Sequence, residues 1–395
     1  MNKELISVAE ARILVAARAE PLEPVKMAIE RALGLAVAED LYAPLDTPAF
    51  DQSSMDGYAI RFEDRAEPLT LQGEMPAGST QPLALFKMHT MRIFTGGPLP
   101  EGADTVVMQE KVAVSGGRIQ VKDQQIKKGT FVRTRGADIK LGELVLEKKT
   151  LLSATKIGIL ASIGIAEIRV FPPPAISIIA TGKELQKPGN SLHFGQVYES
   201  NSYFLHAGLR QAFVREIRTL QADDELNIVR EKLALTLVNS DIVLLTGGVS
   251  VGDYDFVRKA ADLNGIVCQF HKVKQKPGKP FYFGTKGNQL IFGLPGNPAS
   301  VITCFYEYVL PAIDQMMQRP KNKLETAALK EPFYKAEGLT QFLKGYVENG
   351  IVSILAGQES YRLRSFAGAN CLVRLDEQKL VYEKGEEVTI RLLPA

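Results

Sequence analysis

The chain has 395 residues, of which 45% are hydrophobic and 23% are charged, and this composition is typical of a globular protein with roughly three domains. Its formal net charge of +2 gives no reason to expect nucleic acid or an anionic membrane as a partner, and no apolar run approaches the ~20 residues of a membrane span. Three widely spaced cysteines and four histidines at unrelated spacings argue against a disulfide framework and a histidine-based zinc site, so we expect a cytoplasmic protein.

Residues 1–40 carry two helical patterns. Ser7 and Glu10 form a capping box ahead of apolar residues at helical spacing. A second helix is indicated by apolar residues at positions i, i+3, i+4, i+7 and i+8, counted from Val25. A third helical pattern follows Ser153, a predicted N-cap, much later in the chain.

Between these helical segments, residues 46–143 form a predicted β-rich domain. Short alternating segments are separated there by Gly, Pro and Asp. These segments are Tyr58–Arg61, Met91–Phe94, Thr105–Met108 and Arg118–Val121. We therefore predict that residues 1–45 and 144–172 form one discontinuous helical stalk that carries residues 46–143 as an insertion. The proline triplet at 172–174 marks the boundary to the next domain.

Strands and helices alternate in residues 173–318, which predicts an α/β domain with a parallel sheet. The predicted strands are Ala175–Ala180, Val214–Leu220, Ile242–Leu245, Val267–Val273 and Leu290–Phe292. Helical patterns cover 200–212, 225–238 (with Asp223 as N-cap), 255–263 and the residues from about 298. Residues 319–395 return to strands and form a predicted small C-terminal β domain, with strands at Phe342–Val347, Val352–Leu355, Cys371–Leu375 and Val388–Leu392. The fold class is therefore α/β plus β, in several domains.

Three predicted strands of the α/β domain end in loops that suit an anion. Two of them end in Thr-Gly, at Thr181 and Thr246, and a third opens into the segment Leu294–Ser300 ahead of a helix. Glycines let backbone N–H groups approach a ligand, and ligands bind at the carboxyl ends of parallel strands. Singly, each loop is explained equally well as a structural turn. Together, at one sheet edge, they favour a nucleotide or phosphate pocket in which Pro298 begins a helix whose free N–H groups and Ser300 hydroxyl face the anion.

A cationic hairpin follows the predicted strand 267–273. Four lysines lie within residues 272–279, and Pro277 and Gly278 make the turn rigid. Lysine acts as a point charge for phosphate or another oxyanion. The alternative is a solvated basic turn, but the hairpin is expected at the same sheet edge as the glycine loops.

Three further motifs lie in the β-rich insertion. They are Asp51–Ala59, Thr95–Val107 and the segment 133–138 with two arginines and an aspartate. Taken alone, each is explained as a structural turn or loop.

In combination and in this order, the motifs resemble those of the molybdopterin molybdenumtransferase family, which comprises bacterial molybdenum insertases and related domains of plant and animal molybdenum-cofactor proteins. The motifs are Asp51–Ala59, Thr95–Val107, Arg135–Asp138, Thr181–Leu185, Thr246–Asp255, Lys276–Pro280 and Leu294–Ser300. The resemblance covers nearly the whole chain and is weakest in the C-terminal β domain.

The resemblance implies an enzyme that inserts molybdate into adenylylated molybdopterin, with Mg²⁺-dependent cleavage of the phosphoanhydride and release of AMP and molybdenum cofactor. It also implies a homodimer whose active cleft lies between the α/β domain of one subunit and the β-rich insertion of the other. A molybdopterin adenylyltransferase and apo-molybdoenzymes are further implied partners, and no nucleic acid or membrane is expected.

The resemblance assigns roles to individual residues. The implied catalytic residues are Asp56, Asp138, Glu184, Asp224 and Asp255, of which Asp224 and Asp255 hold Mg²⁺. The implied substrate-binding residues are Thr95, Arg133, Thr246, Gly247, Gly248, Ser250, Lys272, Pro295, Gly296, Asn297 and Pro298. The implied molybdate-binding residues are Lys276, Lys279, Pro280, Ser300, Lys344 and Ser365, and Lys344 stands where the family commonly has Arg.

Two other functions are compatible with part of the sequence. A molybdopterin adenylyltransferase uses a related α/β domain, but the motifs of the β-rich insertion and the second β domain argue against it. A non-catalytic scaffold is disfavoured by the acids at 184, 224 and 255. Molybdate-dependent release of AMP, ATP-dependent adenylylation, or neither, distinguishes the three functions.

Overall fold

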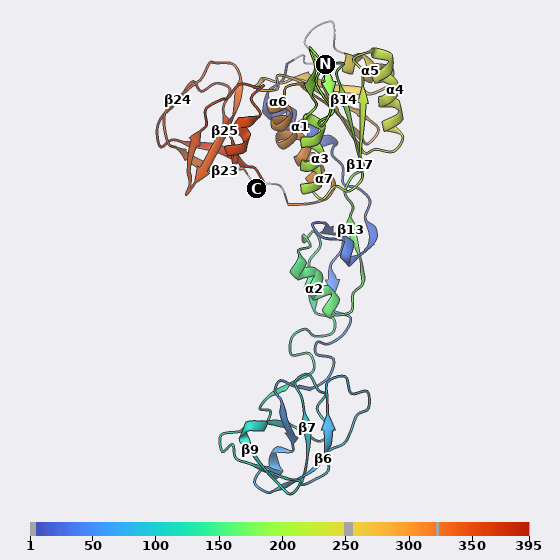
Figure 1. The fold of residues 1–395 in the computed structure, drawn as a ribbon, viewed down its shortest axis with the longest axis vertical. Coiled ribbons are helices and arrows are strands. Elements are labelled where there is room, and N and C mark those ends of the chain that lie inside the picture. Colours follow the sequence, from blue (N-terminus) through green and yellow to red (C-terminus); the bar gives the residue numbers. More distant parts are fainter. Residues whose placement is uncertain (1–4, 249–255, 321–323, 395) are drawn as a thin grey trace.

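The computed structural model describes residues 5–248, 256–320 and 324–394. The molecule is elongated (Figure 1). A broad upper body contains the α/β domain and the C-terminal β domain, a narrow stalk contains α2 (Ala154–Ser162), and a lower lobe contains β6 (Leu69–Met75) and β7 (His89–Ile93). The residue limits given above for the four domains stay a prediction.

A six-stranded sheet forms the centre of the α/β domain. Its order is β17 (Ile217–Ala222), β14 (Ile176–Thr181), β18 (Ile242–Thr246), β22 (Gln289–Leu294), β21 (Pro280–Lys286) and β19 (Val267–Lys272). The first four strands are parallel, as expected for apolar strands buried on both faces. β21 is antiparallel to both of its neighbours, so the edge strand β19 has an antiparallel partner, whereas a parallel sheet was expected. β21 itself was not predicted.

Helices cover both faces of this sheet. They are α3 (Asn201–Gln211), α4 (Leu226–Leu237), α5 (Phe256–Leu263) and the continuous run of α6 (Pro298–Cys304), the π-helix η4 (Phe305–Val309) and α7 (Leu310–Met316). The expected N-cap at Asp223 is wrong, because α4 is preceded by Glu225, which makes no side-chain capping bond. The π-helical turn was not predicted either.

Helix α1 (Val8–Arg18) has the predicted capping box, with Ser7 and Glu10 bonded to each other's backbone N–H groups. Contrary to the stalk assignment, it packs against α7 and η4 of the α/β domain. Arg12 of α1 pairs with the buried carboxylate of Glu307, which also accepts a hydrogen bond from Arg391 in the last strand of the chain. Buried charge pairing therefore fixes α1 to the upper body.

The stalk is mixed rather than helical. The predicted helix after Ser153 is present as α2, and Ser153 caps it as expected. The predicted second helix is instead β1 (Val25–Ala28) followed by the short 3-10 turn Ile29–Arg31. β1 pairs with β13 (Glu167–Phe171), and β2 (Ala36–Val37) completes a three-stranded sheet. The apolar spacing from Val25 spans too few turns to hold a helix against strand pairing from a distant segment.

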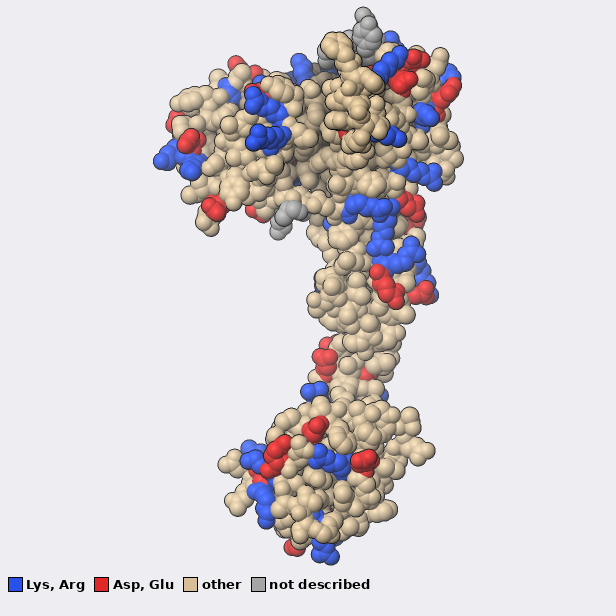
Figure 2. All heavy atoms as spheres, viewed as in Figure 1, with Lys and Arg blue, Asp and Glu red and all other residues tan. Residues whose placement is uncertain are grey.

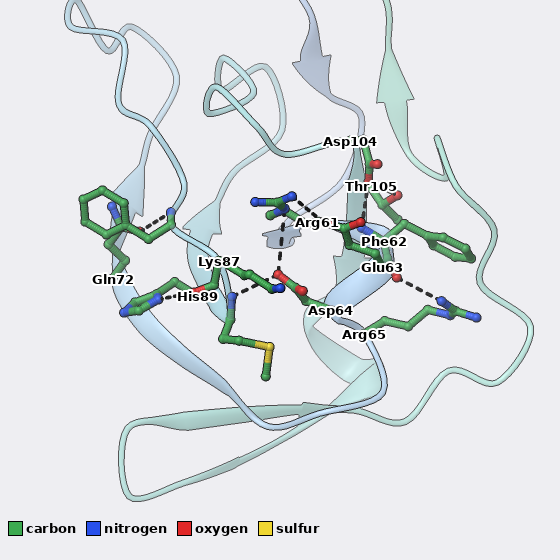
Figure 3. Close-up of polar contacts among 12 residues, drawn as sticks. Arg61, Phe62, Glu63, Asp64, Arg65, Gln72, Lys87, His89, Asp104 and Thr105 are labelled. Carbon is green, nitrogen blue, oxygen red and sulfur yellow. Dashed lines mark hydrogen bonds and ion pairs between the residues drawn. The ribbon is translucent and has the colours of Figure 1, made fainter.

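The lower lobe contains a six-stranded sheet with the order β8 (Thr105–Met108), β5 (Gly57–Ile60), β7, β6, β10 (Arg118–Val121) and β9 (Val112–Ser115). All four strands predicted here are confirmed within a few residues. Two carboxylates secure the turn after β5, because Asp104 accepts a hydrogen bond from the backbone of Phe62 and the buried Asp64 accepts one from the backbone of Met88 (Figure 3). These contacts lie after β5, whereas the predicted site residues Asp56 and Thr95 meet just before β5.

The C-terminal β domain is a closed sheet. Its strands are β25 (Thr340–Glu348), β26 (Ile351–Ile354), β23 (Glu325–Leu329), β29 (Glu387–Leu392) and β27 (Cys371–Leu375), and β27 pairs again with β25. A further short strand, β20 (Gln275–Lys276), comes from the α/β domain and pairs in parallel with β25. The cationic hairpin therefore belongs to the backbone hydrogen bonding of both domains.

Positive and negative side chains are interspersed over the face shown in Figure 2, in keeping with the small net charge. Among the described residues, no helix is both long and apolar enough to cross a membrane.

Candidate active site

The carboxyl ends of β14, β18 and β22 meet at one point. Gly247 has a positive φ of 83°, and a Cβ there would lie 2.3 Å from the carbonyl oxygen of Thr181. Only glycine can occupy this position. A Cβ at Gly296 would lie 3.9 Å from the Cα of Gly247, so the loop after β22 reaches the same point. The predicted convergence of three loops is confirmed for Thr181, Thr246–Gly248 and Pro295–Gly296.

Two of the predicted acids lie beside these glycines. A Cβ at Gly248 would lie 3.8 Å from a carboxylate oxygen of Asp224. A Cβ at Gly182, which follows β14, would lie 2.9 Å from a carboxylate oxygen of Glu184. The Oδ1 atom of Asp224 is buried and has no hydrogen-bond partner among the described residues. Such an uncompensated carboxylate oxygen suits a hard cation such as Mg²⁺.

Ser250 and Asp255, the other predicted residues of the loop after β18, lie outside the described residues. Within the described ranges, no three His, Cys, Asp or Glu side chains gather closely enough to hold a metal. Of the two predicted Mg²⁺ ligands, only Asp224 therefore lies within the described ranges.

The cationic hairpin lies at this same edge, as predicted. Since β19 and β22 run in the same direction on either side of β21, the end of β19 at Lys272 lies on the carboxyl side of the sheet. Lys272 is paired with Pro280 at the start of β21, and the backbone N–H of Val273 donates to the carbonyl of Lys279 across 3.0 Å. Lys276 and Lys279 are exposed at the tip.

The hairpin also touches the helix that starts after β22. A Cβ at Gly278 would lie 3.7 Å from the Cβ of Ser300. However, the N–H groups at this helix start are not free, which corrects the expectation above. Pro298 has none, that of Ala299 donates to Ser360 O at 3.2 Å, and that of Ser300 donates to Asn297 O at 3.0 Å. The positive charge at this point therefore comes from lysines rather than from open helix N–H groups.

A loop of the C-terminal domain completes the cluster. The side chain of Asn297 donates to the Ser360 hydroxyl at 3.1 Å, which joins this loop to the segment after β22. Lys344 is only 2% exposed, and its ammonium contacts the carbonyls of Gly357 (2.7 Å) and Arg362 (3.1 Å) and the hydroxyl of Ser365 (2.7 Å). Burial lowers the pKa of Lys344. Its charge therefore orders the loop that carries Ser365.

A cavity of about 780 Å³ opens between the hairpin and the C-terminal domain. Lys276 and Pro277 form one wall, and Phe333, Gln341 and residues 353–359 form the others. It adjoins the predicted molybdate-binding residues and lies on the side of the hairpin that faces the C-terminal domain.

The four predicted site residues of the β-rich insertion lie in the lower lobe. Asp56 accepts hydrogen bonds from the backbone N–H and the hydroxyl of Thr95, each at 2.8 Å, and these bonds lower its pKa, the backbone bond most. Arg133 lies in β11 (Val132–Arg133) and pairs with Gln52. Gln52 also forms a β-bridge with Pro98, three residues after Thr95 in the sequence. Asp138 is exposed and bonds through its backbone N–H to Thr47 O. The stalk separates all four from the sheet edge within one chain (Figure 1).

The fold and this edge define a class of protein: a multidomain enzyme with a molybdopterin-binding type of α/β domain, an inserted β-rich domain and a C-terminal β domain. Family models agree along nearly the whole chain. Residues 6–164 match the MoeA N-terminal region (domains I and II), residues 177–315 match a probable molybdopterin binding domain, and residues 326–393 match the MoeA C-terminal region (domain IV). The chain belongs to the molybdopterin molybdenumtransferase (MoeA) family.

Individual relatives are similar over their full length. The molybdopterin molybdenumtransferase of Haemophilus influenzae is 33% identical over 385 residues, which cover 94% of each chain. Molybdopterin molybdenumtransferase 2 of Mycobacterium tuberculosis is 33% identical over 405 residues, covering 97% of this chain and 98% of the relative. A crystal structure of a molybdopterin biosynthesis MoeA protein from Pyrococcus horikoshii superposes with a TM-score of 0.80 at 29% identity, over 98% of this chain and 99% of the other.

Proposed function

We propose that this protein inserts molybdate into adenylylated molybdopterin and cleaves the phosphoanhydride, releasing AMP and molybdenum cofactor. The observation that carries the proposal is the convergence of two different kinds of loop at one sheet edge. Glycine loops that suit phosphates lie on one side of the segment after β22, and a lysine hairpin that suits an oxyanion lies on the other side. A substrate that is both a nucleotide and an acceptor of molybdate needs both.

The residues divide the substrate between them. Thr246, Gly247 and Gly248, with Ser250, bind the phosphates, because the glycines leave the backbone accessible. Lys276 and Lys279 supply the positive charge for the molybdate dianion, beside Ser300. The hairpin belongs to the sheets of both domains, so the lysines are held at a fixed place relative to the phosphates.

Asp224 and Asp255 would hold Mg²⁺. The Glu184 carboxylate lies against Gly182, just after the end of β14. Bound Mg²⁺ neutralises charge on the phosphoanhydride and so favours its cleavage. The uncompensated Oδ1 of Asp224 is what supports this assignment in the structure.

The active unit is a homodimer. Asp56, Thr95, Arg133 and Asp138 are grouped in the lower lobe, away from the sheet edge of their own chain. A second copy that places its lower lobe against this edge would complete the cleft. This arrangement would give a role to the exposed Asp56 carboxylate, which two donors from Thr95 hold in place.

Titration of molybdate against AMP release tests the hairpin assignment. Lys279→Ala removes one charge-assisted contact, worth roughly 1.5–3 kcal/mol, so the molybdate concentration for half-maximal release should rise about 10- to 150-fold. Affinity for the adenylylated pterin should be retained. Lys286→Ala is the matched control, because Lys286 ends the same strand at the opposite edge and is also exposed. An unchanged molybdate response in Lys279→Ala, or loss of pterin binding instead, would remove the hairpin from the molybdate site.

A further inference from the structure

The tip of the lysine hairpin is built around a buried amide that the sequence did not single out. Gln275 is 0% exposed and directly precedes Lys276. Its Nε2 atom lies 3.3 Å from Pro277 O, 3.1 Å from Gly278 O and 3.5 Å from the sulfur of Cys304. One side chain therefore engages two successive carbonyls of the turn between the two lysines.

The orientation of this amide is fixed by Tyr308. Carbonyl oxygens only accept hydrogen bonds, so the NH₂ end of Gln275 must face the turn and its Oε1 must face the Tyr308 hydroxyl, which donates to it. Burial raises the pKa of Tyr308 well above its usual value, with the neighbouring Cys304 as a second cause, so the hydroxyl keeps its proton. Burial also raises the pKa of the Cys304 thiol to about 12.

The consequence for the hairpin is electrostatic. A carbonyl oxygen carries partial negative charge and repels an oxyanion. Because Gln275 draws the Pro277 and Gly278 carbonyls inward, the exposed outer side of the turn is left to Lys276 and Lys279. Space is limited as well, since a Cβ at Gly278 would lie 2.9 Å from Gln275 Nε2 and 3.0 Å from Cys304 Sγ. The turn thus has one arrangement, dictated by the amide.

We propose that Gln275, oriented by Tyr308, is a positioning residue for molybdate capture: its amide turns two hairpin carbonyls away from the anion and sets the spacing of Lys276 and Lys279. The proposal rests on the assignment of the hairpin to molybdate in the proposed function. Gln275 does not touch the substrate itself. Without the amide, the two carbonyls lose their partner and turn outward to water, towards the anion.

Gln275→Met removes the amide and keeps the length of the side chain. The matched control is Gln289→Met, because the Gln289 amide also binds two carbonyls, Leu237 O at 2.7 Å and Ser240 O at 2.6 Å, at the opposite end of the same sheet. Two quantities separate positioning from general damage: the molybdate concentration for half-maximal AMP release, and the dissociation constant of adenylylated molybdopterin. The rise in melting temperature caused by molybdate alone gives a third readout that needs no turnover.

Gln275→Met should raise the molybdate concentration for half-maximal release about 5- to 30-fold, with pterin affinity changed less than about twofold. Gln289→Met should change neither by more than about twofold. Tyr308→Phe removes only a hydroxyl and should shift the molybdate response in the same direction by a smaller factor. If Gln275→Met does not fold, Tyr308→Phe decides alone, and an unchanged molybdate response in it overturns the proposal.

Comparison with Lys279→Ala tests the positioning role of Gln275 separately from the assignment of the hairpin to molybdate. A raised molybdate requirement in Lys279→Ala together with a normal one in Gln275→Met ends the positioning role and leaves the hairpin assignment intact. A normal requirement in both variants shows that the hairpin is not the molybdate site, and both assignments then fall. An equal loss of molybdate and pterin binding in Gln275→Met would show general disruption of the edge and also overturns the positioning role.

Discussion

At the scale of single residues, Asp56 shows how hydrogen bonds keep an exposed carboxylate ionised. The backbone N–H and the hydroxyl of Thr95 both donate to the same oxygen, and hydrogen bonds to the charged form lower a carboxyl pKa. The side chain is exposed, so it can meet a substrate or a second subunit in this state.

Thr95→Val should therefore raise the pKa of Asp56. The substitution keeps the backbone bond, which is the largest cause of the lowered pKa, and removes the hydroxyl bond, which is the second. The pKa should move part of the way back to its ordinary value, as followed by a carboxyl NMR titration. Thr95→Ser retains both donors and should leave the titration unchanged. A pKa that does not move in Thr95→Val would mean that the hydroxyl bond is absent in solution.

The residues themselves show which contacts a sequence can predict. The Ser7–Glu10 capping box was predicted because both partners lie within one helical turn. The glycine loops were predicted because carboxyl ends of parallel strands share an edge. Gln275 and Tyr308 were missed because they are 33 positions apart, and only the folded chain brings them together. The resemblance assigned Lys344 of β25 to molybdate, and that role stays a prediction. Its buried ammonium binds the loop that carries Ser365, a contact that the sequence did not indicate.

At the scale of elements, the same limit applies. β21 was missed because the lysine hairpin, with its two prolines, dominated the pattern just before the apolar run 281–283. The helix expected from Val25 was wrong because its partner strand, β13, lies more than 130 residues further on. The eight strands predicted in the two β domains are confirmed, since their alternation is local, but β6, β9 and β23 were missed. Packing between elements, such as α1 against α7, was not visible in any window of the sequence.

The buried Glu307 connects three elements and should be important for stability. It accepts from Arg12 of α1 and Arg391 of β29. Glu307→Gln would leave the Arg12 guanidinium without its carboxylate partner and Arg391 with only the charge of Asp314. We expect the free energy of unfolding to fall by about 3–5 kcal/mol, measured by urea denaturation. Glu63→Gln makes the same change in an exposed pair with Arg61 and should cost less than ~1 kcal/mol. Equal losses in the two variants would contradict the structural role of Glu307.

At the scale of the whole molecule, the predicted site residues fall into two groups, one at the sheet edge and one in the lower lobe. The lower lobe and the sheet edge of one chain are held apart by the stalk (Figure 1). A homodimer with shared sites predicts complementation between subunits that are defective in different lobes.

Mixing Asp56→Ala with Asp224→Ala subunits should restore activity. After free exchange of equal amounts, half of the dimers are mixed and each has one intact cleft of two, so about a quarter of wild-type AMP release is expected. Each variant alone should be nearly inactive. Subunit exchange is verified separately with differently tagged chains. A mixture that exchanges fully and stays inactive would show that each cleft is built from a single chain.

The pairing of β20 with β25 has a mechanical consequence. β20 belongs to the closed C-terminal sheet, and four residues later the chain enters β21 of the α/β sheet. The lysine hairpin thus links the sheets of the two domains. The C-terminal domain cannot move away from the α/β domain unless the hydrogen bonds between β20 and β25 break. Movement between the domains is therefore expected at the stalk, where two small sheets and α2 join the lobes. In the proposed homodimer, the lysine hairpin then keeps its place relative to the glycine loops, and the part of the cleft that moves is the lower lobe of the other subunit.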